Sequence, residues 1–206
     1  MILHSEIQQQ DRNKVNRWIR NLERILDQIS NVDEMDLPQA LKEISQGNKN
    51  LIVMAMIQPS LKNTFNEINV HFHRVEGAES EVLKNLYASP EIAKSLAWIG
   101  DTAIKSAVLK KIWKQGISPK ELHKARQSLE TNENLSRLCD RWKLFEHRIH
   151  LDPEDPKSKS IKKIKGTLVE SMFGVILIEK GSGGVQEVIP MIYGTENPAG
   201  NELSIT

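Results

Sequence analysis

One long apolar stretch that carries a carboxylate constrains this chain most. Residues 95–113, SLAWIGDTAIKSAVLKKIW, contain no proline and have apolar side chains at helical spacing over a wide face. A helix of this kind is normally buried on most sides. Asp101 nevertheless stands in its middle, and an isolated buried charge is costly unless it is paired, hydrogen-bonded or bound to a metal. The pattern therefore directs the search for function to this acid.

A second long helix, predicted over residues 161–179, has the same combination of features. Glu170 lies in its otherwise apolar face. Each helix also contains a glycine, which costs about 1 kcal/mol relative to alanine inside a helix. Gly100 precedes Asp101, and Gly174 lies one turn after Glu170. Because glycine permits close backbone approach, a crossing at these positions would bring the two carboxylates together.

Two carboxylates on facing helices are one way to hold a divalent cation in a helical core. Oxygen ligands with several retained waters suit Mg²⁺ or Mn²⁺. The alternative is that Asp101 pairs with Lys105, one turn along, and that Glu170 pairs with a nearby lysine. The residue pattern leaves both interpretations open.

Almost every other periodic segment is typical of a helix, so the predicted class is all-α. Ser118, Pro119 and Glu121 form the pattern of a capped helix N-terminus. Residues 11–30 predict an amphipathic helix that either packs on the main domain or binds a partner. Its predicted apolar seam consists of Val15, Ile19, Leu22, Leu26 and Ile29.

Residues 66–90 have a different pattern. Ile68, Val70 and Phe72 alternate with polar residues, as in a short strand. His71 and His73 would then share one strand face, but no third metal ligand is evident. Exposed histidines in an inserted loop or hairpin are therefore favoured over a metal site.

Composition narrows the function classes. The 206 residues are 39% hydrophobic and 27% charged, which is typical of one soluble domain with a core. Lys and Arg number 28 against 27 Asp and Glu, so net charge does not indicate a strongly basic nucleic-acid binder. The single cysteine, Cys139, lies on a helical apolar stripe and is interpreted as a core residue. Neither a secretory signal nor a membrane-spanning run is found, so we expect no membrane partner and a cytoplasmic location.

Four stretches, in order, resemble the ribonuclease III family. Residues 96–113 are similar to its signature helix, and residues 121–151 to its connecting helices. Residues 163–194 resemble its second catalytic helix and closing helix, and residues 51–63 its first core helix. The predicted organisation is an N-terminal helical extension over 1–35, a ribonuclease III-like domain over 36–194 with an insertion at about 66–90, and a flexible tail over 195–206.

The resemblance implies a homodimeric, metal-dependent endoribonuclease that hydrolyses phosphodiester bonds in structured or double-stranded RNA. The family's Asp and Glu map onto Asp101 and Glu170, which implies that these residues are catalytic and bind Mg²⁺ or Mn²⁺. The family's aromatic dimer anchor maps onto Trp98, which would fill a socket on the partner. Ordinary core packing is the alternative for this tryptophan.

The chain departs from the family at three positions and from one of its branches at a fourth. The family has acids where this chain has Lys94, Ala97 and Thr167. The thinner acid set looks like the Mini-III branch, which lacks the double-stranded-RNA-binding domain. Mini-III-like sequences carry an acid at the position of Lys105. That lysine either competes with a metal for Asp101 or faces RNA phosphate.

Two lysine clusters flank the proposed acid pair and are predicted to contact RNA phosphates on either side of a scissile bond. Recognition would then follow the shape and backbone of duplex RNA, whereas the alternative for the lysines is solvated surface charge. The predicted RNA-binding residues are Lys105, Lys110, Lys111, Lys162, Lys163 and Lys165.

Three functions follow from these patterns. The preferred one is a Mini-III-like endoribonuclease, a hydrolase that processes RNA. The second is a catalytically degenerate protein of the same fold that binds RNA or a ribonucleoprotein without cleaving it, as the substituted acids favour. The third is an interaction scaffold that uses the N-terminal helix as its contact.

Overall fold

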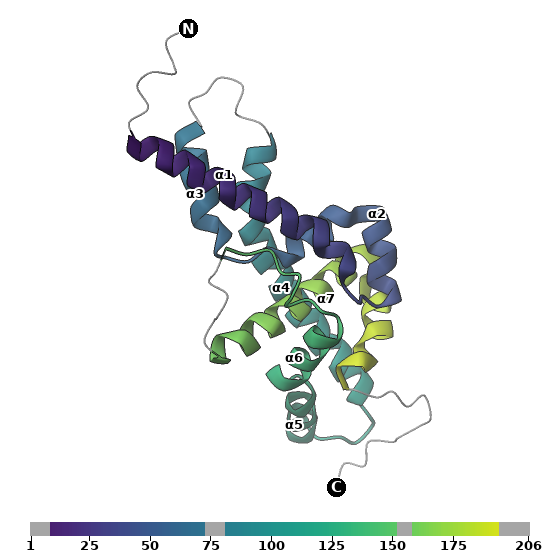
Figure 1. Cartoon of the computed structure of the whole chain (residues 1–206). Coiled ribbons are helices and arrows are strands. Elements are labelled where there is room, and N and C mark those ends of the chain that lie inside the picture. The colour runs from purple at the N-terminus through teal and green to yellow at the C-terminus, as the bar shows by residue number, and fades with distance from the viewer. Residues whose placement is uncertain (1–8, 73–80, 152–157, 194–206) are drawn as a thin grey trace.

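The computed structural model describes residues 9–72, 81–151 and 158–193, and these ranges are almost entirely helical (Figure 1). They contain no strand, only an isolated parallel bridge between Ile57 and Ile149, which confirms the all-α class. None of the helices described is both long enough and apolar enough to span a membrane. In chain order the helices are α1 Gln9–Ser30, the 3-10 helix η1 Asn31–Glu34, α2 Gln39–Met56, α3 Leu61–Phe72, α4 Glu81–Ile112, α5 Pro119–Leu129, α6 Asn132–Arg141, α7 Ser158–Val188 and the 3-10 helix η2 Ile189–Tyr193.

The two long helices α4 and α7 cross in the middle of the molecule and make the most extensive contact between any two elements described (Figure 1). Their backbones touch at the two glycines. A Cβ atom at Gly100 would lie only 1.7 Å from the carbonyl oxygen of Glu170, and one at Gly174 only 2.1 Å from that of Leu96. Any residue with a side chain would therefore push the helices apart, and the predicted close crossing is confirmed.

The hydrophobic core surrounds this crossing. The side chains of Met172 and Phe173 in α7 are fully buried, and the ring centroids of Phe173 and Trp142 lie 6.1 Å apart. Cys139 is also fully buried, as the apolar stripe of α6 predicts. Burial raises the pKa of its thiol to about 12, so Cys139 is a core residue rather than a nucleophile.

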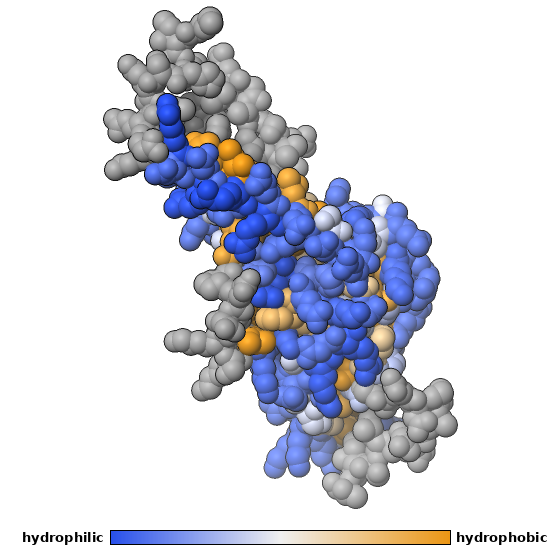
Figure 2. Space-filling model, viewed as in Figure 1, coloured by the Kyte–Doolittle hydropathy of each residue, from blue (hydrophilic) through white to orange (hydrophobic). Residues whose placement is uncertain are grey.

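Helix α1 packs on the domain through a face that overlaps the predicted seam but is rotated from it, since Leu22 and Ile29 of the seam pack against the core. Trp18 and Ile25 are buried, whereas Ile19 and Leu26 of the predicted seam are 48% and 65% exposed. The Trp18 indole N–H donates to the carboxylate of Glu67 in α3 at 2.8 Å, so the tryptophan sets the rotation of α1. The outer face of α1 is hydrophilic, and apolar side chains gather along its edge toward α3 and α4 (Figure 2).

The strand predicted at residues 68–72 is wrong, because this segment continues α3. Leu61, Phe65 and Ile68 are buried and follow helical spacing, and the strand pattern cut across this stripe. A shared strand face for His71 and His73 is therefore lost, and His73 lies outside the described residues. On the far side of the gap, α4 already begins at Glu81 and contains Pro90, so the central helix is longer than predicted.

The predicted helix start at Ser118 is confirmed. The backbone N–H of Glu121 donates to the Ser118 hydroxyl oxygen at 3.3 Å, and the Glu121 carboxylate accepts from the Ser118 N–H at 2.9 Å. This capping box begins α5, and α5 packs on α4. The predicted tail over residues 195–206 lies outside the described residues.

The glycine crossing makes a direct stability prediction. Gly100→Ala should lower the free energy of unfolding by more than about 2 kcal/mol, because the added methyl group overlaps backbone atoms that cannot rotate away. Urea denaturation followed by circular dichroism measures this change. The matched control is Gly183→Ala in α7, the other helix of the crossing, where an added Cβ meets nothing within 4 Å. That variant should keep or slightly raise stability, and an equal loss in both variants would contradict the tight crossing.

Candidate active site

The crossing positions the two acids singled out by the sequence. Asp101 follows Gly100 on α4, and the carbonyl oxygen nearest to Gly100 belongs to Glu170 on α7. The two acids thus stand in adjacent turns of facing helices. The Asp101 side chain is 35% exposed and Glu170 is half-buried. The pair therefore lies at the edge of the core, where solvent or a ligand has access.

The Glu170 carboxylate is electrostatically unfavourable in its folded position. Burial and, to a smaller extent, the negative charge of Asp101 raise its pKa to about 7, and Lys105 partly opposes this shift. No lysine or arginine forms an ion pair with Glu170 among the described residues. The lysine partner considered for this glutamate is therefore absent from the structure described.

Asp101, in contrast, has a partner. The Lys105 ammonium lies 2.6 Å from the Asp101 carboxylate, one helical turn along α4. This confirms the pairing that the sequence left open. Both side chains are more than one third exposed, and an ion pair at such a position contributes little net stability. A ligand with greater charge could displace the lysine.

The substituted family positions add no acid to the site. Lys94 is exposed and pairs with Glu91 at 3.1 Å. Ala97 is buried, and Thr167 is half-buried with its carbonyl oxygen accepting the hydroxyl of Ser171 at 2.9 Å. In the ranges that the structure describes, no group of three or more His, Cys, Asp or Glu side chains could hold a metal ion.

The donor set nevertheless fits one hard divalent cation. Asp101 and Glu170 offer carboxylate oxygens, and the open side of the site leaves coordination positions for water or phosphate oxygens, as Mg²⁺ prefers. The mutual repulsion of the two carboxylates, which contributes to the raised pKa of Glu170, is the condition that a divalent cation relieves. The site resembles an open metal site, not a closed protein cage.

Glu130, which immediately follows α5, is an acid of this region that the sequence analysis missed. It pairs with Arg126 at 3.3 Å, and burial raises the pKa of its carboxyl. Lys105 lowers this pKa and Asp101 raises it, so Glu130 lies within electrostatic reach of the Asp101 pair. In the sequence, its four-residue spacing from Arg126 is typical of a surface ion pair, and no other signal marks it as part of a site.

Three of the six lysines predicted to contact RNA are already engaged in ion pairs. Lys105 bonds Asp101, as described. Lys162 pairs with Glu133, and Lys165 pairs with Asp140, each at 2.5 Å. Only 18% of the Lys165 side chain is exposed. These lysines are therefore less available to phosphate than their sequence positions suggest.

The other three predicted lysines are exposed at the surface. The Lys111 ammonium lies 5.8 Å from the ring centroid of Tyr193, which leaves its charge open to solvent. Only half of the six predicted lysines are therefore outside ion pairs among the described residues. The positive surface beside the acid pair is smaller than predicted for this reason. The exposed members are Lys110, Lys111 and Lys163.

Trp98 is 75% exposed, three residues before Asp101 on α4. The core-packing alternative for this tryptophan is therefore wrong. An exposed indole of this size is typical of a contact surface, because tryptophan is enriched in protein–protein interfaces.

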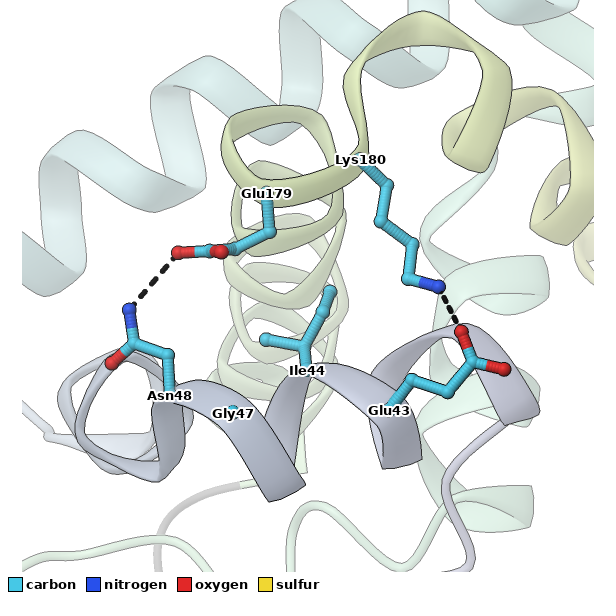
Figure 3. Close-up of a pocket in the computed structure, with 6 residues that line it drawn as sticks. All are labelled: Glu43, Ile44, Gly47, Asn48, Glu179 and Lys180. Carbon is cyan, nitrogen blue, oxygen red and sulfur yellow. Dashed lines mark hydrogen bonds and ion pairs between the residues drawn. The ribbon is translucent and has the colours of Figure 1, made fainter.

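A separate hollow of about 470 Å³ lies between α2 and α7, and none of the predicted site residues lines it (Figure 3). Its polar groups bond across it. Asn48 donates to Glu179 at 2.9 Å, and the Lys180 ammonium pairs with Glu43. These contacts join the two helices, and the hollow has no feature that indicates chemistry.

A comparison with protein families shows a likeness for the segment that contains the site. Residues 94–181 match the family model of the ribonuclease III domain. This part of the chain is similar to that domain. The matched range begins in α4 and ends at the kink of α7 at Gly181, so it includes the glycine crossing and both acids of the site. No curated protein and no solved structure matches the chain.

The raised pKa of Glu170 predicts a cost in stability when no metal is bound. The folded protein holds the proton more tightly than the unfolded chain, so stability falls as the pH rises from 4.5 to about 7. In EDTA and above pH 7, Glu170→Gln should therefore raise Tm by at least about 2–4 °C. Differential scanning calorimetry measures this gain, which should disappear as the pH is lowered toward 4.5.

The matched control for this experiment is Glu187→Gln, which removes an exposed acid from the same helix. Its Tm should not change with pH relative to the parent protein. A lower Tm for Glu170→Gln above pH 7 would show instead that the ionised carboxylate stabilises the fold.

Proposed function

We propose that this protein is a metal-dependent endoribonuclease that hydrolyses phosphodiester bonds in structured or double-stranded RNA and acts as a homodimer. The observation that carries the proposal is the placement of Asp101 and Glu170 in adjacent turns of α4 and α7, inside the matched ribonuclease III domain. That domain supports endoribonuclease activity at the level of the family.

In this proposal Asp101 and Glu170 hold one Mg²⁺ or Mn²⁺ ion. Such an ion, when bound, supplies an activated water and stabilises the charge that develops on the scissile phosphate. The residues of the chain do the remaining work. The glycine crossing fixes the separation of the two carboxylates, and Asp101 must exchange its bond to Lys105 for the cation.

RNA would bind through backbone phosphates beside this acid pair. Lys110, Lys111 and Lys163 are exposed and are proposed as the main phosphate contacts, because the other predicted lysines are paired with acids. Few base-reading side chains are identifiable, so the shape and backbone of the duplex would provide recognition. RNA phosphates would also complete the coordination of a cation that has only two protein carboxylates.

The finer assignment to the Mini-III branch is part of the proposal. It is supported by Lys94, Ala97 and Thr167, which replace family acids. Dimerisation is supported by the 75% exposure of Trp98. A partner subunit would cover this large indole, which a monomer leaves in contact with solvent. The cytoplasmic location stays a prediction.

A second candidate function has an observation in its favour. The ion pair between Lys105 and Asp101 neutralises the first proposed metal ligand, as expected for a catalytically degenerate protein. Such a protein would bind RNA or a ribonucleoprotein through its exposed lysines and would not cleave it. Cleavage and binding measured together distinguish the two functions.

The proposed function predicts metal-dependent cleavage of a labelled RNA duplex. Asp101→Asn should lower the cleavage rate in Mg²⁺ or Mn²⁺ by at least about 100-fold, because the neutral amide is a poor cation ligand. Duplex affinity in a filter-binding assay should stay within about twofold. EDTA should abolish cleavage by the parent protein, and Glu187→Gln, a distant exposed acid on α7, should cleave normally.

A double variant of two exposed lysines gives the opposite pattern. Lys110→Gln with Lys163→Gln should weaken duplex binding and reduce its dependence on salt by about two phosphate contacts. Duplex binding without any cleavage by the parent protein would favour the degenerate alternative. Absence of both binding and cleavage would leave the scaffold function.

The dimer proposal predicts that Trp98→Ala raises the dimer dissociation constant by about 30-fold, as expected for a buried tryptophan anchor. Sedimentation velocity over a concentration series measures this change. Trp113→Ala is the matched control, because it removes another tryptophan, 65% exposed, immediately after the same helix. A monomeric parent protein, or equal effects of the two substitutions, would contradict a specific role for Trp98.

A further inference from the structure

Metal binding at the proposed site raises a problem of charge that only the structure reveals. The Lys105 ammonium occupies one oxygen of Asp101 at 2.6 Å. A divalent cation on that carboxylate would repel the ammonium at this distance. Lys105 must therefore move when a cation arrives. Its side chain is 43% exposed, so the ammonium then binds either water or another protein oxygen within reach.

Glu130 offers such an oxygen. Its Oε1 atom is buried and accepts no hydrogen bond, and it is the only carboxylate oxygen in that condition among the described residues. The other oxygen pairs with Arg126 at 3.3 Å, which keeps negative charge on the group. The side chain of Glu130 is only 12% exposed, so an empty buried acceptor is costly and favours a new donor.

Lys105 is suited to reach this oxygen. Glu130 follows the last turn of α5, which packs on α4, and Lys105 and Asp101 both act on the Glu130 carboxyl electrostatically. A lysine carries its charge on a flexible stem with rotatable donors, so it can change partners without movement of the helix. The acids Glu133 and Asp140 of α6 are not free to receive it, because they already pair with lysines of α7.

We propose that Glu130 is a positioning residue, which receives the Lys105 ammonium when a divalent cation binds Asp101 and Glu170. The inference rests on the proposed function, since it assumes a cation at that pair. It gives Lys105 two places, on Asp101 without metal and on Glu130 with metal. The lysine then protects the site when it is empty and does not block it when a cation is available.

The test is a Mn²⁺ titration of the full chain without RNA, in which electron paramagnetic resonance measures free Mn²⁺. Glu130→Gln should weaken Mn²⁺ binding about tenfold, because Lys105 loses its charged alternative and stays on Asp101. Lys105→Gln should tighten binding by removing the competitor. Adding Glu130→Gln to Lys105→Gln should then change affinity by less than about twofold.

The matched control is Glu133→Gln, which removes a nearby exposed acid and should leave Mn²⁺ affinity unchanged. Circular dichroism establishes that each variant is folded. A direct readout is a crystal structure with Mn²⁺, in which the Lys105 nitrogen should lie within about 3.5 Å of Glu130 Oε1.

Two results would overturn the inference and leave the proposed function intact. One is an equal effect of Glu130→Gln with and without Lys105, and the other is Lys105 still bonded to Asp101 in the Mn²⁺ structure. No Mn²⁺ binding by either the parent protein or Lys105→Gln would overturn both the inference and the metal site on which the proposed function depends.

Discussion

The backbone contact between α4 and α7 is the constraint on which the rest of this structure depends. At Gly100 and Gly174 each helix presents bare backbone to the other, and the carbonyl oxygens of Glu170 and Leu96 occupy the space that side chains would need. Glycine weakens both helices locally, but the close approach allows the surrounding apolar side chains to form one core. It also fixes which turns of the two helices face each other, and so where the acids stand.

The charges around this crossing are incompletely balanced. Glu170 is half-buried without an ion-pair partner among the described residues, and Glu130 has one buried oxygen that accepts nothing. A core selected for stability alone would satisfy or remove such groups. Groups that are left unsatisfied in the folded protein are typical of functional sites, where the missing partner is a ligand. The imbalance therefore agrees with a site that acquires charge from outside the chain.

The thin acid set and the lysine beside it are better understood together. A site with only two available carboxylates binds a cation weakly by itself, and a lysine that shares one of them weakens it further. In the proposed function, RNA phosphates would add both oxygen ligands and negative charge. Metal binding would then be strongest when substrate is present, which couples the chemistry to recognition of the duplex.

The sequence by itself determined the helical class, the two long apolar helices and their glycines, because side-chain periodicity and backbone freedom are local properties. The capped start of α5 and the buried position of Cys139 followed from the same local rules. The buried face of α1 did not follow from these rules, because the large Trp18 side chain sets the rotation of the helix. The helical structure of residues 68–72 did not follow either, because the apolar stripe of α3 begins earlier in the chain and outweighs the local alternation of apolar and polar residues.

Only the tertiary structure decided which side chains are exposed and which charged groups form ion pairs. The exposure of Trp98, the pairing of Lys162 and Lys165, and the place of Glu130 beside the α4 site depend on residues far apart in the chain. A charged side chain has the same letter in the sequence whether its partner is a neighbouring acid, water or a ligand. The choice is made by the distances and burial that folding creates.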